Sequence, residues 1–168
     1  MGTAIKIQER DRLFAEARKK REAGDYAAAA EAFSQVTERY PDHAPAWVAL
    51  GELLQIQFSD AVTAENCFKK AIETDPGIAS AYIAYTSLLI DKQRFAEANA
   101  MINKALGVAG RDLDQALYQS ALFRESQGRL EEAAETYKKA IMASFSDETI
   151  TACEKGIHRC EVKRRYRE

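Results

Sequence analysis

The chain has 168 residues, of which 46% are apolar and 30% are charged, and this balance excludes a disordered tail. The formal net charge of −2 gives no overall field that would attract nucleic acid or an anionic membrane, and no apolar run approaches the length of a membrane-spanning helix. Only eight glycines and three prolines occur, so the composition favours an all-helical chain.

The first helix predicted in each repeat contains a large apolar anchor residue. A small residue follows this anchor four positions later. A spacing of four places both residues on one face of a helix. These anchors recur every 34 or 35 residues along the chain. They are Leu13, Trp47, Tyr82 and Leu117, followed by the small residues Ala17, Gly51, Thr86 and Ala121.

A second predicted helix follows each anchor helix and has its own repeated pattern. The four stretches read "GDYAAAAEAFSQVT" from residue 24, "SDAVTAENCFKKAI" from 59, "QRFAEANAMINKAL" from 93 and "GRLEEAAETYKKAI" from 128. Their sixth position is always alanine and their tenth is large and apolar or aromatic: Ala29, Ala64, Ala98 and Ala133, then Phe33, Phe68, Ile102 and Tyr137. Small residues let a neighbouring helix approach closely, and the large one fills the space between helices.

Each repeat is therefore predicted to be a pair of antiparallel helices joined by a tight turn. Pro41 and Pro76 end the second helices of the first two repeats, because proline cannot continue a helix, and Gly110 takes this place in the third. One pair cannot bury its own apolar face, so stacked copies are expected to build a continuous core.

The pattern resembles the tetratricopeptide repeat family. The motif W-x2-L-G is present at Trp47, Leu50 and Gly51, the Ala-x3-Phe pairs are Ala29/Phe33 and Ala64/Phe68, and the period also fits. The departures are Glu16 and Ser120, where leucine is usual, and Phe145, where the fourth repeat would carry proline. The resemblance implies an all-α fold, a right-handed α-solenoid of four helix-turn-helix repeats over about 10–43, 44–78, 79–112 and 113–145.

One more helix is predicted over 146–165. Ser146 can cap its start, and a narrow apolar stripe steps along it by three and four residues: Ile150, Cys153, Ile157 and Cys160. We interpret it as a C-terminal capping helix that covers the open end of the last repeat, with the basic residues 163–168 fraying beyond the stripe. Residues 1–168 are then expected to form a single domain.

No group of residues predicts catalysis, a cofactor or a metal site. His43 and His158 are expected at the surface, Cys67 is expected to pack within a helix pair, and no Cys or His pair has metal-ligand spacing. The basic stretch "KRRYR" is the best nucleic-acid candidate, but one basic run on an acidic chain is interpreted as a solvated tail. We therefore expect neither an enzyme nor a nucleic-acid-binding protein. The first residues meet charge too early for a secretory signal, so a cytoplasmic location is expected.

The family resemblance implies a binding groove lined by the first helix of each pair. Carried over position by position, its apolar floor is Phe14, Val48, Ile83 and Tyr118. The next rows are Arg18, Glu52, Ser87 and Leu122, and then Arg21, Gln55, Ile90 and Glu125. An amphipathic peptide with acidic residues near Arg18 and Arg21 would suit this surface. The alternative is that neighbouring helices cover the four apolar residues as part of the core.

Family members that grip the C-terminal tails of heat-shock chaperones use Lys, Asn and Arg side chains across three repeats. The matching positions here carry one basic residue and no Asn: Phe14, Arg18, Ala49, Ser80 and Ala84. The first three repeats are therefore not expected to bind such tails.

The resemblance implies a non-enzymatic adaptor or scaffold that binds a peptide or helix of a partner protein. Two alternatives stay open. The groove or the cap face could pack against another copy to form a homo-oligomer, or the chain could be the interaction domain of a larger enzyme.

Overall fold

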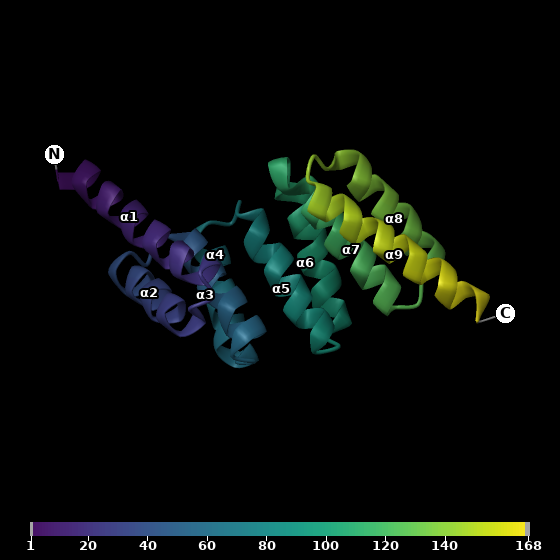
Figure 1. Ribbon diagram of the computed structural model, residues 1–168, viewed down its shortest axis with the longest axis horizontal. Coiled ribbons are helices and arrows are strands. Elements are labelled where there is room, and N and C mark those ends of the chain that lie inside the picture. Colours follow the sequence, from purple (N-terminus) through teal and green to yellow (C-terminus); the bar gives the residue numbers. More distant parts are fainter. Residues whose placement is uncertain (1, 167–168) are drawn as a thin grey trace. The chain divides into compact units, whose positions relative to one another are not determined.

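The computed structural model describes residues 2–166, with the backbone only for residues 2 and 3. Within that part the chain forms nine α-helices and one 3₁₀ helix and contains no strand, which confirms the all-α prediction (Figure 1). The contacts divide the chain between Ala81 and Tyr82 into two compact units, which we call unit 1 and unit 2. That residues 1–168 form a single domain stays a prediction.

Unit 1 contains two helix pairs. They are α1 (Gly2–Glu22) with α2 (Tyr26–Arg39), and α3 (Ala44–Gln57) with α4 (Ala61–Thr74). Each helix packs against the next one along the chain, α1 on α2, α2 on α3 and α3 on α4. A fifth helix, α5 (Ala79–Asp91), begins in unit 1 and continues into unit 2.

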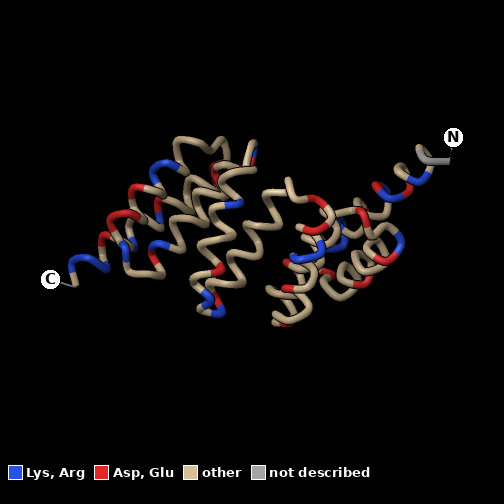
Figure 2. The backbone as a smooth tube through the Cα atoms, turned by 180° about the vertical axis from the view of Figure 1, so that it is seen from behind, with Lys and Arg blue, Asp and Glu red and all other residues tan. Residues whose placement is uncertain are grey.

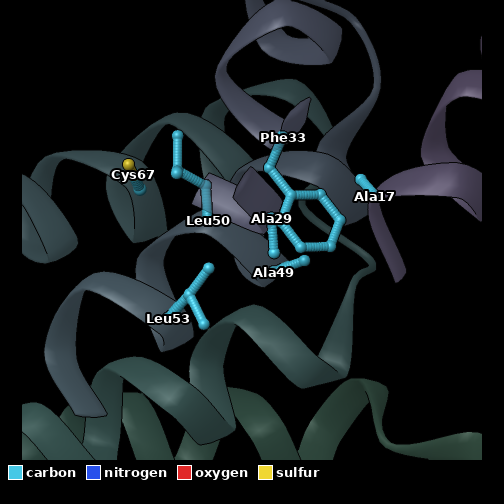
Figure 3. Packing of buried hydrophobic residues seen from close by; sticks show 7 residues of the cluster. All are labelled: Ala17, Ala29, Phe33, Ala49, Leu50, Leu53 and Cys67. Carbon is cyan, nitrogen blue, oxygen red and sulfur yellow. The ribbon is translucent and has the colours of Figure 1, made fainter. Parts of the chain in front are cut away.

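The repeated small and large positions form the core of unit 1. Figure 3 shows seven buried members of this cluster, which are Ala17, Ala29, Phe33, Ala49, Leu50, Leu53 and Cys67. Gly51 allows a close approach, because a Cβ atom built on it would lie 2.6 Å from the Phe68 ring. This small residue after the anchor Trp47 thus permits α4 to pack close to α3.

Unit 2 contains the remaining helices. They are the rest of α5, α6 (Phe95–Val108), the 3₁₀ helix η1 (Gly110–Asp112), α7 (Leu113–Ser126), α8 (Leu130–Ala143) and α9 (Asp147–Arg165). α7 packs on α6 and α8, and α9 packs along α8 and also contacts α7 (Figure 1). The core contains the repeat positions of α7 and α8 together with two cysteines of α9: Ala121, Leu130, Ala133, Tyr137, Ala140, Cys153 and Cys160.

Each hairpin turn contains one residue with a left-handed backbone. These residues are Gly24 (φ 80°), Ser59 (φ 55°), Gln93 (φ 57°) and Gly128 (φ 72°). They are the first residues of the four related stretches in the sequence, so the turn repeats in the same register as the helices. Glycine adopts this conformation without steric strain, whereas serine and glutamine do not.

Two helix ends extend further than the repeat pattern. α1 begins at Gly2, ahead of the expected start of the first repeat near residue 10, because the intervening residues contain no helix breaker; the repeat bounds themselves stay a prediction. Residues 163–168 were expected to fray, but α9 continues to Arg165 and Lys163 is held by an ion pair with Glu125. Of the expected fraying segment, residues 167–168 lie outside the described part of the chain.

Candidate protein-binding cleft

In unit 1 the two apolar residues of the predicted groove are largely packed. Val48 is only 5% exposed. The ring of Phe14 is half-buried and lies 5.7 Å from the Phe33 ring and 4.8 Å, edge-on, from the His43 ring. His43 directly precedes α3, and burial followed by the charge of Arg10 lowers its pKa. These residues therefore offer little apolar surface to a partner.

The predicted charged residues of unit 1 all form ion pairs. The Nη1 atom of Arg21 donates to Oε2 of Glu52 at 3.3 Å, and Arg18 forms an ion pair with Glu22 at 3.6 Å. Burial raises the pKa of Glu52, and the neighbouring Arg21 opposes this shift. Gln55, the remaining predicted residue, is half-buried. The basic end that the sequence predicted is thus partly neutralised.

In unit 2 the structure brings four of the predicted residues into one cleft. Ser87 and Ile90 of α5 and Leu122 and Glu125 of α7 line a cleft of about 320 Å³. The other lining residues are Asp91, Gln119, Ser126, Arg159 and Lys163. Ile90 and Leu122 are half-buried and give the cleft an apolar floor. We call this the unit 2 cleft.

The two other predicted residues of unit 2 lie outside that lining. Ile83 is half-buried on α5. Tyr118 packs against the Tyr137 ring in a tilted arrangement, with 5.8 Å between the centroids, and lines a neighbouring cleft with residues of α9. Arg159 lines both clefts, so the two hollows adjoin at this side chain.

Glu125 is the centre of a buried ionic cluster. Its side chain is 7% exposed and receives donors on both oxygens. Arg159 donates through Nε to Oε1 at 3.1 Å and through Nη2 to Oε2 at 2.9 Å, Lys163 donates to Oε1 at 2.8 Å, and the Tyr137 hydroxyl donates to Oε2 at 2.8 Å. Burial opposes the charge, but the hydrogen bonds from Arg159, Lys163 and Tyr137 outweigh it and lower the pKa of Glu125 to about 2. The carboxylate is therefore ionised at neutral pH.

The capping helix is seated by contacts spread along its length. Ser146 caps its start by accepting from the Thr149 backbone N–H at 3.3 Å, and Gln115 of α7 donates to the Thr149 hydroxyl at 2.7 Å. Further along, Gly156 allows α9 to approach the Tyr137 ring, because a Cβ atom there would lie 2.5 Å from Cζ. These contacts place the cations of α9 beside α7.

Sequence reasoning missed Arg159, Lys163 and Gly156. A signal was present, because two cations four residues apart lie on one helix face and a glycine in mid-helix suggests a close contact. What the pattern could not show is that this face meets Glu125, which is 34 residues from Arg159 in the sequence.

The cysteines and histidines form no reactive or metal-binding group in the described residues. Cys67, Cys153 and Cys160 are buried as free thiols, and burial raises the pKa of Cys67 and of Cys153 to about 11. Between residues 2 and 166 there is no cluster of three or more metal-ligating side chains. Over the same span no helix has both the length and the apolar content needed to cross a membrane.

Comparison with known families identifies the fold. The family model described as "Tetratricopeptide repeat" matches residues 14–77 and 87–148, which together make up more than half of the chain. The chain belongs to the tetratricopeptide repeat family. Repeats of this family are in general non-enzymatic modules for protein–protein interaction.

Solved structures of other repeat proteins share the fold. TTC0263, a thermophilic tetratricopeptide repeat protein of Thermus thermophilus, has a TM-score of 0.75 and 20% identity over 86% of this chain and 79% of that one. PilF of Pseudomonas aeruginosa has a TM-score of 0.82 and 17% identity, over 96% and 71%. PilW, described as a type IV pilus biogenesis factor, has a TM-score of 0.82 and 20% identity, over 92% and 70%. The comparison with curated proteins found no match. At these identities the likeness shows the fold alone.

Proposed function

We propose that this chain is an adaptor or scaffold that binds a peptide or helix of a partner protein, and that the unit 2 cleft is a binding site. One observation carries the proposal. Ser87, Ile90, Leu122 and Glu125, which the repeat register assigned to a groove, line the same cleft. Its apolar floor supplies the area whose burial drives association, at roughly 25 cal/mol per Å² before ordering costs.

The surroundings of this floor suit a polypeptide. Ser87, Ser126 and the charged residues at the edge offer hydrogen-bonding groups around the apolar centre. Protein-binding surfaces commonly combine an apolar centre with a polar rim. Three free, buried thiols are compatible with a reducing compartment, which supports a cytoplasmic location.

The test is a pair of charges placed on the floor. The double variant Ile90→Glu/Leu122→Glu is expected to lose the partners that wild-type protein captures from a cell extract, while circular dichroism shows a folded protein. Val62→Glu is the matched control, because Val62 is 76% exposed on α4 and lies outside the cleft lining. If the folded double variant captures the same proteins as wild type, the cleft is not the binding site.

Self-assembly is a second candidate function, favoured by exposed apolar residues at the end of α8. Met142 is almost fully exposed, and so is Phe145, which follows α8 in the turn to α9. A second copy could cover them. Light scattering at two protein concentrations should then show a mass that rises with concentration in wild type and not in Met142→Ser/Phe145→Ser. A constant monomer mass for wild type contradicts self-assembly.

A further inference from the structure

We propose that α9 forms a selective wall of the unit 2 cleft, where Arg159 and Lys163 bind an acidic side chain of the partner peptide beside the apolar side chain held by Ile90 and Leu122. The inference rests on the proposed function and adds the chemistry of the partner. It also gives the capping helix a role in recognition besides covering the last repeat.

The side chains of the ionic cluster are unequally exposed. One carboxylate, on Glu125, is almost fully buried, whereas its two cationic partners are 43% exposed (Arg159) and 52% exposed (Lys163). The cluster therefore presents a net single positive charge to the cleft. Lys and Arg residues also continue through the last turn of α9, toward the C-terminal end seen in Figure 2.

Both cations have donors left for another acceptor. A guanidinium has five N–H donors and an ammonium has three. Arg159 uses its Nε and Nη2 groups on Glu125 and Tyr137, and Lys163 uses one bond on Glu125. Because Glu125 holds both side chains in place, a second carboxylate would meet donors that are already positioned.

A carboxylate in the cleft lining favours a peptide over a polyanion as the ligand. Asp91 lies in the lining on the α5 side, so the cleft holds a carboxylate as well as the two cations of α9. A phosphate backbone would meet Asp91 and the apolar floor as well as the cations. A peptide with an apolar residue flanked by Asp or Glu can place its carboxylate toward α9 and its apolar side chain on the floor, and the opposite signs would fix its direction.

The experiment uses a phage-displayed library of random dodecapeptides as the probe, selected on the wild-type protein and counter-selected on Ile90→Glu/Leu122→Glu. The expected binders carry Asp or Glu beside a large apolar residue. The most enriched peptide is then synthesised with an amidated C-terminus, and its affinity is measured by fluorescence anisotropy. Replacing its acidic residue by Gln is expected to weaken binding about fivefold, the size of one or two partly exposed ion pairs.

Variants of the protein separate recognition from damage to the fold. Arg159→Gln/Lys163→Gln should bind the acidic peptide no more tightly than the Gln peptide. Arg164→Gln is the matched control and should keep the preference, because Arg164 pairs with exposed Glu131, which is not part of the lining.

Each other outcome overturns the inference in an identifiable way. Enriched peptides that are apolar without acidic residues would leave the proposed function standing and refute the role of α9. Binding only by peptides with a free carboxyl end would assign the cations to a chain terminus instead. Binding of a short oligo(U) that is lost in Arg159→Gln/Lys163→Gln would assign them to RNA. No enrichment over the counter-selection would refute the unit 2 cleft itself, and the proposed function with it.

Discussion

The left-handed turn residues provide the sharpest test of the repeat geometry. Ser59 and Gln93 adopt φ angles of 55° and 57°, whereas the equivalent positions of the other two repeats are glycines. A left-handed backbone costs a residue with a Cβ atom about 1–2 kcal/mol. Glycine removes this cost but adds about 0.4–1 kcal/mol of conformational entropy to the unfolded chain. Ser59→Gly and Gln93→Gly should therefore each stabilise the fold by about 0.5–1 kcal/mol.

Both side chains are exposed, so the substitutions sacrifice no buried packing. Urea unfolding followed by circular dichroism measures the change in stability. The matched control is Gly24→Ala, because a Cβ atom on Gly24 would meet no atom within 4 Å and only its φ of 80° opposes the substitution. Gly24→Ala should destabilise by about 1 kcal/mol. If Ser59→Gly and Gln93→Gly are both destabilising while Gly24→Ala is neutral, the turns are not left-handed and the shared hairpin geometry is wrong.

The other predictions concern the packing of α9 against α7 and α8, and the reactivity of the buried thiols. Gly156→Ala should destabilise unit 2 by about 1–3 kcal/mol, because the added Cβ overlaps the Tyr137 ring, and hydrogen exchange should show the loss of protection concentrated in α9. Because the pKa of Glu125 is lowered from 4.5 to about 2, its contribution to stability is present above pH 4.5 and is lost as the pH falls toward 2. The loss should be on the order of 2–3 kcal/mol in urea unfolding measured across that range, and a slope equally steep in Glu125→Gln would contradict the assignment. Cys67 and Cys153, whose pKa values burial raises to about 11, should react with a thiol reagent at about pH 8 only after urea is added; rapid labelling of the native protein would show that they are accessible.

The sequence alone was sufficient for the helix pairs and their buried faces. The alanines and large residues that recur every 34 or 35 positions are all buried: Ala29, Ala64, Ala98 and Ala133 with Phe33, Phe68, Ile102 and Tyr137. This part was predictable because each contact lies within one hairpin or between adjacent helices. A local spacing of three and four residues decides which side chains share such a face.

The groove was less predictable, because register places a residue on a helix face but does not show what covers it. Of the four residues at the floor position, Val48 is buried, Phe14 packs on two rings and Tyr118 packs against the Tyr137 ring. Glu125, which the repeat register assigned to a groove, lines the unit 2 cleft, but its buried ion pairs were not foreseen.

The repeat period thus determined the all-α fold, the turns and the core columns of this protein by itself, since those depend on neighbours in sequence. Only the tertiary structure decided which charges meet. Arg159 and Lys163 reach Glu125 across 34 and 38 residues because α9 packs back over α8 and touches α7. No local pattern encodes that distance, and a buried carboxylate with two exposed cations exists only once the helix has docked.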